Sequence, residues 1–132
     1  MMAALLLVGQ SVVADGKLIA DPIVERAIRE ELEKPKGKLT ETDLAQVTAL
    51  YLDRTQITDA GLKDVAKLQK LVYLSSNFTK ITDAGLKDVA KLQKLEYVYL
   101  QGPEVTQAGV AELKKALPNC RILASNPPRE TP

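Results

Sequence analysis

Histidine and tryptophan are absent from this chain of 132 residues, and cysteine occurs once, as Cys120. Without histidine, the chain can form no Ser-His-Asp or Cys-His triad, no HExxH zinc site and no imidazole ligand for a metal. A single cysteine can form neither an intrachain disulfide nor a thiolate zinc site. Glycine-rich phosphate loops with the Walker or dinucleotide-binding spacing are also missing. These absences predict a protein that is not an enzyme and that holds no cofactor or metal.

An excess of charge of one sign is also lacking. Eighteen Lys and Arg residues stand against 17 Asp and Glu residues, which leaves a formal net charge of +1. On that balance, neither nucleic acid nor an anionic membrane surface is an expected partner. Aromatic residues make up only 4% of the chain, whereas hydrophobic residues make up 45%. The core must therefore be built from aliphatic side chains.

The first 14 residues, MMAALLLVGQSVVA, are apolar and uncharged. Such a run is too short to span a bilayer as a helix, so we expect no membrane span. Val12 and Ala14 occupy the −3 and −1 positions of a plausible signal-peptidase site, although no Lys or Arg precedes the run. A signal peptide over residues 1–14 predicts a secreted, periplasmic or cell-surface protein. The alternative is an apolar extension packed against the following helix, in a cytoplasmic protein.

The chain repeats itself. Residues 57–71, ITDAGLKDVAKLQKL, recur unchanged at 81–95, and a looser copy, VTQAGVAEL, starts at Val105. The period is therefore 24 residues. The segments that precede the copies share an aliphatic L-x-x-L-x-L spacing and begin at Val47, Leu71 and Leu95.

Each unit of this period combines two hydrophobic patterns. Leu50 and Leu52 alternate with the outward positions of Tyr51 and Asp53, which predicts a short strand with one buried face. The second half of the unit has the spacing of a short helix. A threonine is placed to cap that helix in each unit, at Thr58, Thr82 and Thr106. Stacked units of this kind would share one aliphatic core.

The repeat resembles the leucine-rich repeat over roughly residues 47–123, and its TDAGL element is similar to the ribonuclease-inhibitor-like class. The preceding DPIVERAIREELEKPKGKLTETDLAQVTAL is similar to the helical N-terminal cap of secreted bacterial leucine-rich repeat proteins, including internalin-like ones. Asp21 and Pro22 begin that helix. The resemblance implies an α/β fold: a short leucine-rich repeat solenoid with parallel strands on the concave face and short helices on the convex face. It divides the chain into a cap over 15–46, repeats over 47–125 and a disordered tail over 126–132.

All four tyrosines fall on outward strand positions. Tyr73 and Tyr97 share one register, and Tyr51 and Tyr99 share the next, with Ser75 between them. Exposed tyrosine on a rigid surface is typical of binding hot spots, although tyrosine also favours strands for its own sake. The candidate binding residues on this face are Tyr51, Asp53, Arg54, Tyr73, Ser75, Asn77, Phe78, Tyr97, Tyr99 and Gln101.

These features favour a non-catalytic module that binds a protein partner through its concave strands. A first alternative is a structural unit that self-associates through its C-terminal edge, or a fragment of a longer repeat array. A second alternative is carbohydrate binding on the tyrosines.

Two positions depart from the repeat. Ser76 replaces the inward leucine of the other strands, so aliphatic packing is lost and its hydroxyl needs a partner. Pro103 replaces Thr55 and Thr79, at a position where leucine-rich repeats commonly bond the neighbouring loop through a side chain. We therefore expect looser loop contacts near Pro103. Cys120 is expected to be a buried apolar residue.

Overall fold

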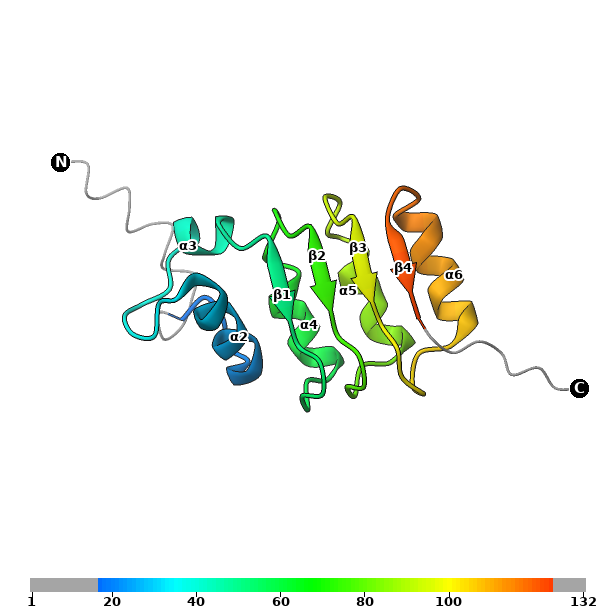
Figure 1. The fold of residues 1–132 in the computed structure, drawn as a ribbon, viewed down its shortest axis with the longest axis horizontal. Coiled ribbons are helices and arrows are strands. Elements are labelled where there is room, and N and C mark those ends of the chain that lie inside the picture. The colour runs from blue at the N-terminus through cyan, green and yellow to red at the C-terminus, as the bar shows by residue number, and fades with distance from the viewer. Residues whose placement is uncertain (1–16, 125–132) are drawn as a thin grey trace, which may run out of the picture.

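The computed structural model describes residues 17–124, which form a mixed α/β fold with a four-stranded, all-parallel sheet (Figure 1). The predicted signal peptide over 1–14 and the predicted tail over 126–132 lie outside the described residues. The strands are β1 (Ala49–Tyr51), β2 (Tyr73–Ser75), β3 (Tyr97–Tyr99) and β4 (Arg121–Leu123). The helices are α2 (Pro22–Leu32), α3 (Glu41–Ala45), α4 (Asp59–Val65), the 3₁₀ helix η1 (Asp83–Gly85), α5 (Leu86–Val89) and α6 (Gln107–Ala116). None of the described helices has the length and apolar character needed to cross a membrane.

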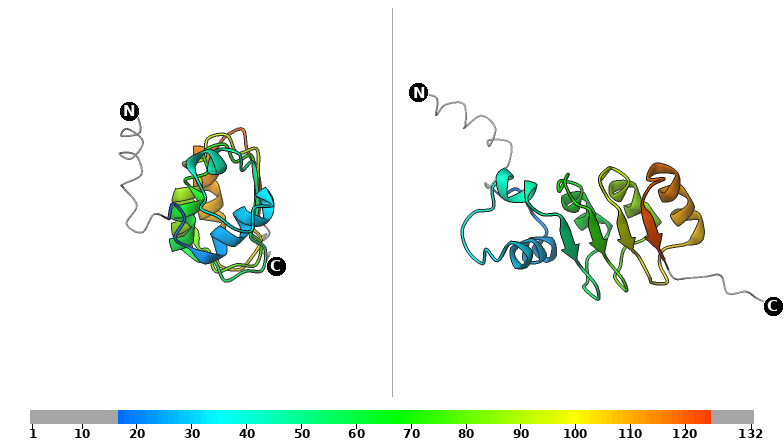
Figure 2. Two further views of the ribbon diagram at one scale, coloured as in Figure 1. Left: turned by 90° about the vertical axis from the view of Figure 1, so that its left-hand side faces the viewer. Right: turned by 45° about the horizontal axis from the view of Figure 1, so that its top comes forward.

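The strands pair in chain order, β1-β2-β3-β4. Ala49 pairs with Tyr73, Tyr73 with Tyr97, and Tyr97 with Arg121, so each strand is in register with the residues one sequence period away. Helices α4, α5 and α6 lie along one side of the sheet (Figures 1 and 2). We call the opposite side, which these helices do not cover, the open face.

The core lies between the sheet and the helices and is aliphatic, as the composition predicted. Leu50, Leu74 and Val98, the central residues of three neighbouring strands, are completely buried. Leu62 and Val65 of α4 are buried with them. The alternation of the sequence therefore assigned the two faces of the strands correctly.

The helix caps follow the prediction at two of the three threonines. Thr106 accepts a hydrogen bond from Gly109 N and caps α6, and Thr82 accepts one from Ala84 N and caps η1. Thr58 precedes α4 but makes no side-chain cap hydrogen bond, so the prediction was wrong there. Thr82 and Thr106 are also held by carboxylates from the preceding unit, whereas the described residues provide no carboxylate hydrogen bond to Thr58.

Those carboxylates form a ladder between units that the sequence analysis did not anticipate. Asp59 accepts hydrogen bonds from Thr82 N (2.8 Å) and Thr82 Oγ1 (2.6 Å). Asp83 accepts the same two bonds from Thr106, 24 residues further along than Thr82. We call these two contacts the Asp–Thr ladder. They tie the starts of η1 and α6 to the unit that precedes each of them.

At the N-terminal end, α2 begins where the sequence predicted. Asp21 accepts hydrogen bonds from Ile23 N and Val24 N, and Pro22 occupies the first turn. Val24 and Ile28 are completely buried. The helix ends at Leu32.

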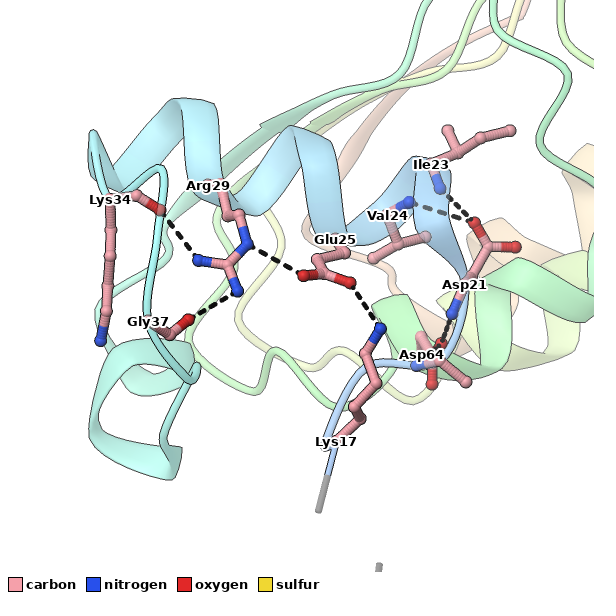
Figure 3. Close-up of polar contacts among 10 residues, drawn as sticks. Lys17, Asp21, Ile23, Val24, Glu25, Arg29, Lys34, Gly37 and Asp64 are labelled. Carbon is pink, nitrogen blue, oxygen red and sulfur yellow. Dashed lines mark hydrogen bonds and ion pairs between the residues drawn. The ribbon is translucent and has the colours of Figure 1, made fainter. Parts of the chain in front are cut away.

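The loop after α2 is held by Arg29 (Figure 3). Its guanidinium donates to Lys34 O (3.0 Å) and Gly37 O (2.7 Å) and pairs with Glu25 (2.9 Å). Glu25 also pairs with Lys17 at 3.0 Å. A short helix that the sequence analysis did not single out, α3, follows the loop. Its capping box of Thr40 and Asp43 is a local signal that could have revealed it.

The ion pairs of Glu25 and Asp43 predict a loss of stability in acid. Hydrogen bonds from Lys17 and then Arg29 lower the pKa of Glu25, and hydrogen bonds from Lys34 and then the Thr40 backbone lower the pKa of Asp43. Both carboxyls therefore bind protons less readily in the folded chain than in the unfolded chain. The stabilisation is present above the pKa values of the unfolded chain, about 4, and is lost as the pH falls through the lower folded values.

We expect urea midpoints to fall steeply in that acid range. The double variant Glu25→Gln/Asp43→Asn should be less stable than wild type near neutral pH. Its urea midpoint should also fall less steeply as the pH is lowered. Equal slopes for the two proteins would contradict a role of these pairs in acid stability.

We expected the position of Thr55, Thr79 and Pro103 to link neighbouring loops, and the hydrogen bonds of the two threonines correct this expectation. Thr55 Oγ1 donates to Leu52 O (2.8 Å) and Thr79 Oγ1 to Ser76 O (3.3 Å), so both bonds stay within their own loops. The position that Pro103 occupies therefore does not link neighbouring loops. That link is made two residues earlier along the chain, by Asp53 and Asn77, as described below.

Ser76 lies in the row of Leu52 and Leu100 and is 2% exposed. Among the described residues, its hydroxyl has one hydrogen-bond partner, Thr79 Oγ1 at 3.3 Å. Because a leucine there would restore aliphatic burial, we expect Ser76→Leu to raise the melting temperature by the equivalent of about 1 kcal/mol. Ser76→Ala serves as the control, since it removes the hydroxyl without adding volume. Differential scanning calorimetry checks this, and a clear drop for Ser76→Leu with no drop for Ser76→Ala would mean that neighbouring side chains already fill the space.

Candidate functional site

The register of the sheet brings the four tyrosines together on the open face. Tyr73 is at the centre: its ring centroid lies 5.3 Å from that of Tyr51, 5.4 Å from that of Tyr99 and 6.5 Å from that of Tyr97. The three rings are tilted by 39° to 43° against that of Tyr73, and their separations from it lie in the range of about 4.5 to 7 Å that aromatic pairs prefer. We call these four residues the tyrosine cluster. The two registers predicted from the sequence are those observed.

The cluster is accessible at its outer members. Tyr51 is 54% exposed and Tyr97 is 42% exposed, whereas Tyr73 and Tyr99 are half-buried. Burial raises the pKa of the Tyr73 hydroxyl, and the neighbouring Tyr99 and Tyr51 add to that increase. The hydroxyl therefore stays protonated near neutral pH and can donate a hydrogen bond. The face combines apolar rings with polar hydroxyl groups.

Asp53, Asn77 and Gln101 form a polar row beside the cluster, and the side chains of Asp53 and Asn77 are hydrogen-bonded within the protein. Asp53 accepts hydrogen bonds from Ser75 Oγ (2.7 and 2.8 Å) and from Asn77 N (2.7 Å). Asn77 Oδ1 in turn accepts one from Gln101 N at 2.7 Å. These bonds join successive loops, so Asp53 and Asn77 act first as structural links. Gln101 is half-buried at the end of the row.

One predicted contact residue is wrongly assigned. Ser75 is 3% exposed, so it cannot form part of a surface that touches a partner. Its small side chain lies in the row between Tyr51 and Tyr99, and its hydroxyl donates to Asp53. Ser75 therefore lies beneath the accessible surface and helps to hold the Asp53 carboxylate in place.

Arg54 and Phe78 form an exposed pair at the edge of this face. The guanidinium carbon of Arg54 lies 4.9 Å from the centroid of the Phe78 ring, which is a cation–π contact. Phe78 is 48% exposed. Both residues have positive φ, 59° for Arg54 and 54° for Phe78, and Gly102 one period later has φ 153°. The structure thus brings together two residues that the sequence placed only at strand exits.

The candidate residues predicted from the sequence do not include two residues of the open face. Arg121 pairs with Tyr97 and Leu123 pairs with Tyr99, so both stand on outward positions of β4. Leu123 is 39% exposed, and Arg121 is exposed. Extending the period by one more unit from Tyr97 and Tyr99 would have identified both.

Two hollows on the described part of the surface lie away from this face. One of about 470 Å³ is lined by residues of η1, α5 and α6, and one of about 550 Å³ lies beside α3, near Leu44 and Lys67. Neither is lined by the tyrosine cluster. Cys120 is buried, and its burial raises the pKa of the thiol, which disfavours the reactive thiolate. Within residues 17–124, no group of three or more acidic or cysteine side chains is placed to hold a metal ion.

No family model matches the chain, and no curated protein has a significantly similar sequence. The function is therefore inferred from the tyrosine cluster and its surroundings.

Proposed function

We propose that the chain is a short leucine-rich repeat protein, with its strands on the concave face of a solenoid and its helices on the convex face. The spacing of the sequence supports this assignment. So do the strands, which pair in register one period apart, and the Asp–Thr ladder, which recurs with the same period. Residues 15–46, which include α2 and α3, would then be the N-terminal cap.

We further propose that this protein is a non-catalytic module that binds a protein partner through the open face of its sheet. The observation that carries this proposal is the tyrosine cluster, in which three rings pack around that of Tyr73 and the outer members Tyr51 and Tyr97 are about half exposed. In a chain that has only four tyrosines, all four are on this face. Tyrosine offers contact area and a hydroxyl at a low entropic cost, which is why it is enriched in binding sites.

Two observations weaken the alternatives. The rings are tilted by 39° or more against one another, so they form no single flat platform for a sugar ring. In the last unit, Gln107 replaces the aspartate of Asp59 and Asp83, so the Asp–Thr ladder has no further acidic acceptor for another copy.

The experiment compares two double variants. We expect Tyr51→Ala/Tyr97→Ala to fold normally, because both side chains are largely exposed, and to lose partner binding by about tenfold or more. Lys87→Ala/Lys114→Ala, which alters exposed residues on the helix side, should bind as wild type does.

Binding is measured by photocrosslinking in extracts of the source organism, with p-benzoylphenylalanine placed at position 97 or at position 87. Specific crosslinks from position 97 that Tyr51→Ala suppresses would support the proposal. Crosslinks from position 87 alone, or none that depend on Tyr51, would contradict it. A glycan array with the same variants separates sugar binding from protein binding.

A further inference from the structure

Arg54 carries a charge that no acid of the protein neutralises in the described part of the chain. None of the ion pairs there includes its guanidinium. The adjacent carboxylate, that of Asp53, accepts hydrogen bonds from Ser75 and Asn77 instead. Arg54 itself is exposed. A guanidinium in this state has its N–H donors available to an external acceptor.

Phe78 restricts the motion of this cation. Its ring lies 4.9 Å from the guanidinium carbon, and a planar cation stacked on a ring has fewer orientations than a free side chain. An anion that binds Arg54 would therefore meet a group that is already partly ordered, which reduces the entropic cost of binding.

The backbone at these two positions is costly for their side chains. A left-handed conformation is unfavourable for a residue other than glycine. Arg54 and Phe78 adopt it at φ 59° and 54°, although Gly102 occupies the equivalent position one period later. Folding alone would favour glycine at all three positions. Strained residues of this kind cluster at binding sites, where their side chains are used.

From these observations we infer that the partner of the open face is a protein segment that presents an acidic side chain to Arg54. This inference rests on the proposed function and specifies the partner's chemistry. Arg54 follows Tyr51 by three residues, which separates their backbones by at most about 10 Å, so a short extended segment can contact both. The carboxylate would accept two parallel hydrogen bonds from the guanidinium, and the rest of the segment would lie on the tyrosine cluster.

The probe is a displayed library of random dodecapeptides, selected separately on four proteins. These are the wild type, Arg54→Glu, the control Arg26→Glu and the double variant Tyr51→Ala/Tyr97→Ala. Arg26 is an exposed arginine of α2, so its substitution changes the net charge equally. Arg54→Gln is added because it removes the charge without placing a second carboxylate beside Asp53. Thermal unfolding establishes that each variant is folded.

We expect peptides selected on wild type to be enriched in Asp and Glu, and that enrichment to be kept on Arg26→Glu and lost on Arg54→Glu. An individual acidic peptide should bind Arg54→Gln about tenfold more weakly than wild type. Peptides that need the tyrosines but show no acidic preference, or that tolerate Arg54→Gln, would overturn this inference and leave the proposed function standing. A library that yields no tyrosine-dependent peptide would overturn both.

Discussion

Replacing Gly85 with Ala is expected to destabilise the protein by about 2 kcal/mol, although the same change in an ordinary helix stabilises by nearly 1 kcal/mol. The reason is a close approach between units. A Cβ at Gly85 would clash with Asp59 Oδ1 and would lie 2.7 Å from Leu62 Cδ1. Asp59 cannot move aside freely, because Thr82 donates two hydrogen bonds to it, at 2.8 and 2.6 Å. Urea unfolding monitored by circular dichroism measures the effect.

A double-mutant cycle tests whether the carboxylate is the cause. Asp59→Ala alone should destabilise, since it removes both acceptors of Thr82. Adding Gly85→Ala to Asp59→Ala should then cost much less than it does in wild type, because the clash with the carboxylate is gone. If the two changes are additive, Leu62 rather than Asp59 determines the need for glycine.

Replacing Asp64 with Ala is expected to destabilise by about 3 kcal/mol. Asp64 is 7% exposed, and its Oδ2 accepts hydrogen bonds from Ala20 N (2.9 Å) and Asp21 N (2.8 Å), which joins α4 to the segment before α2 (Figure 3). Its Oδ1 pairs with Lys67 at 3.0 Å. Removing the carboxylate leaves two backbone donors without their acceptor in a partly buried site. Helix α2 and the segment before it should then separate from α4 before the rest of the chain unfolds.

The matched control is Asp88, which occupies the same position one period later. It is 8% exposed and pairs with Lys91 (3.2 Å) and Lys63 (3.8 Å), but the described residues offer it no backbone N–H hydrogen bond. Asp88→Ala should therefore cost about 1 kcal/mol or less. Hydrogen exchange of the α2 amides adds a local readout, and we expect faster exchange in Asp64→Ala only. Equal losses of stability in the two variants would refute the role of Asp64 in holding α2 and its preceding segment against α4.

The period of the sequence was enough to predict much of the candidate site. Identical spacing placed Tyr73 beside Tyr97, and Tyr51 in one row with Tyr99, since strands of equal register repeat every 24 residues. The period also places Asp53, Asn77 and Gln101 at equivalent positions of successive units. It did not reveal that Asp53 and Asn77 would use their acceptors on the neighbouring loops. That outcome depends on distances between units, which no local pattern contains.

By itself, the sequence determined the aliphatic core and the outward tyrosines, because hydrophobic periodicity is a local property that each unit repeats, and the resemblance of its repeat implied parallel strands. Only the tertiary structure decided which polar residues are buried and which residues adopt a strained backbone. It buried Ser75 and Asp64, set Asp59 against Gly85 and placed Arg54 on Phe78 in left-handed backbone. Burial and hydrogen bonding depend on which groups from different units meet, and that pairing exists only once the units have packed.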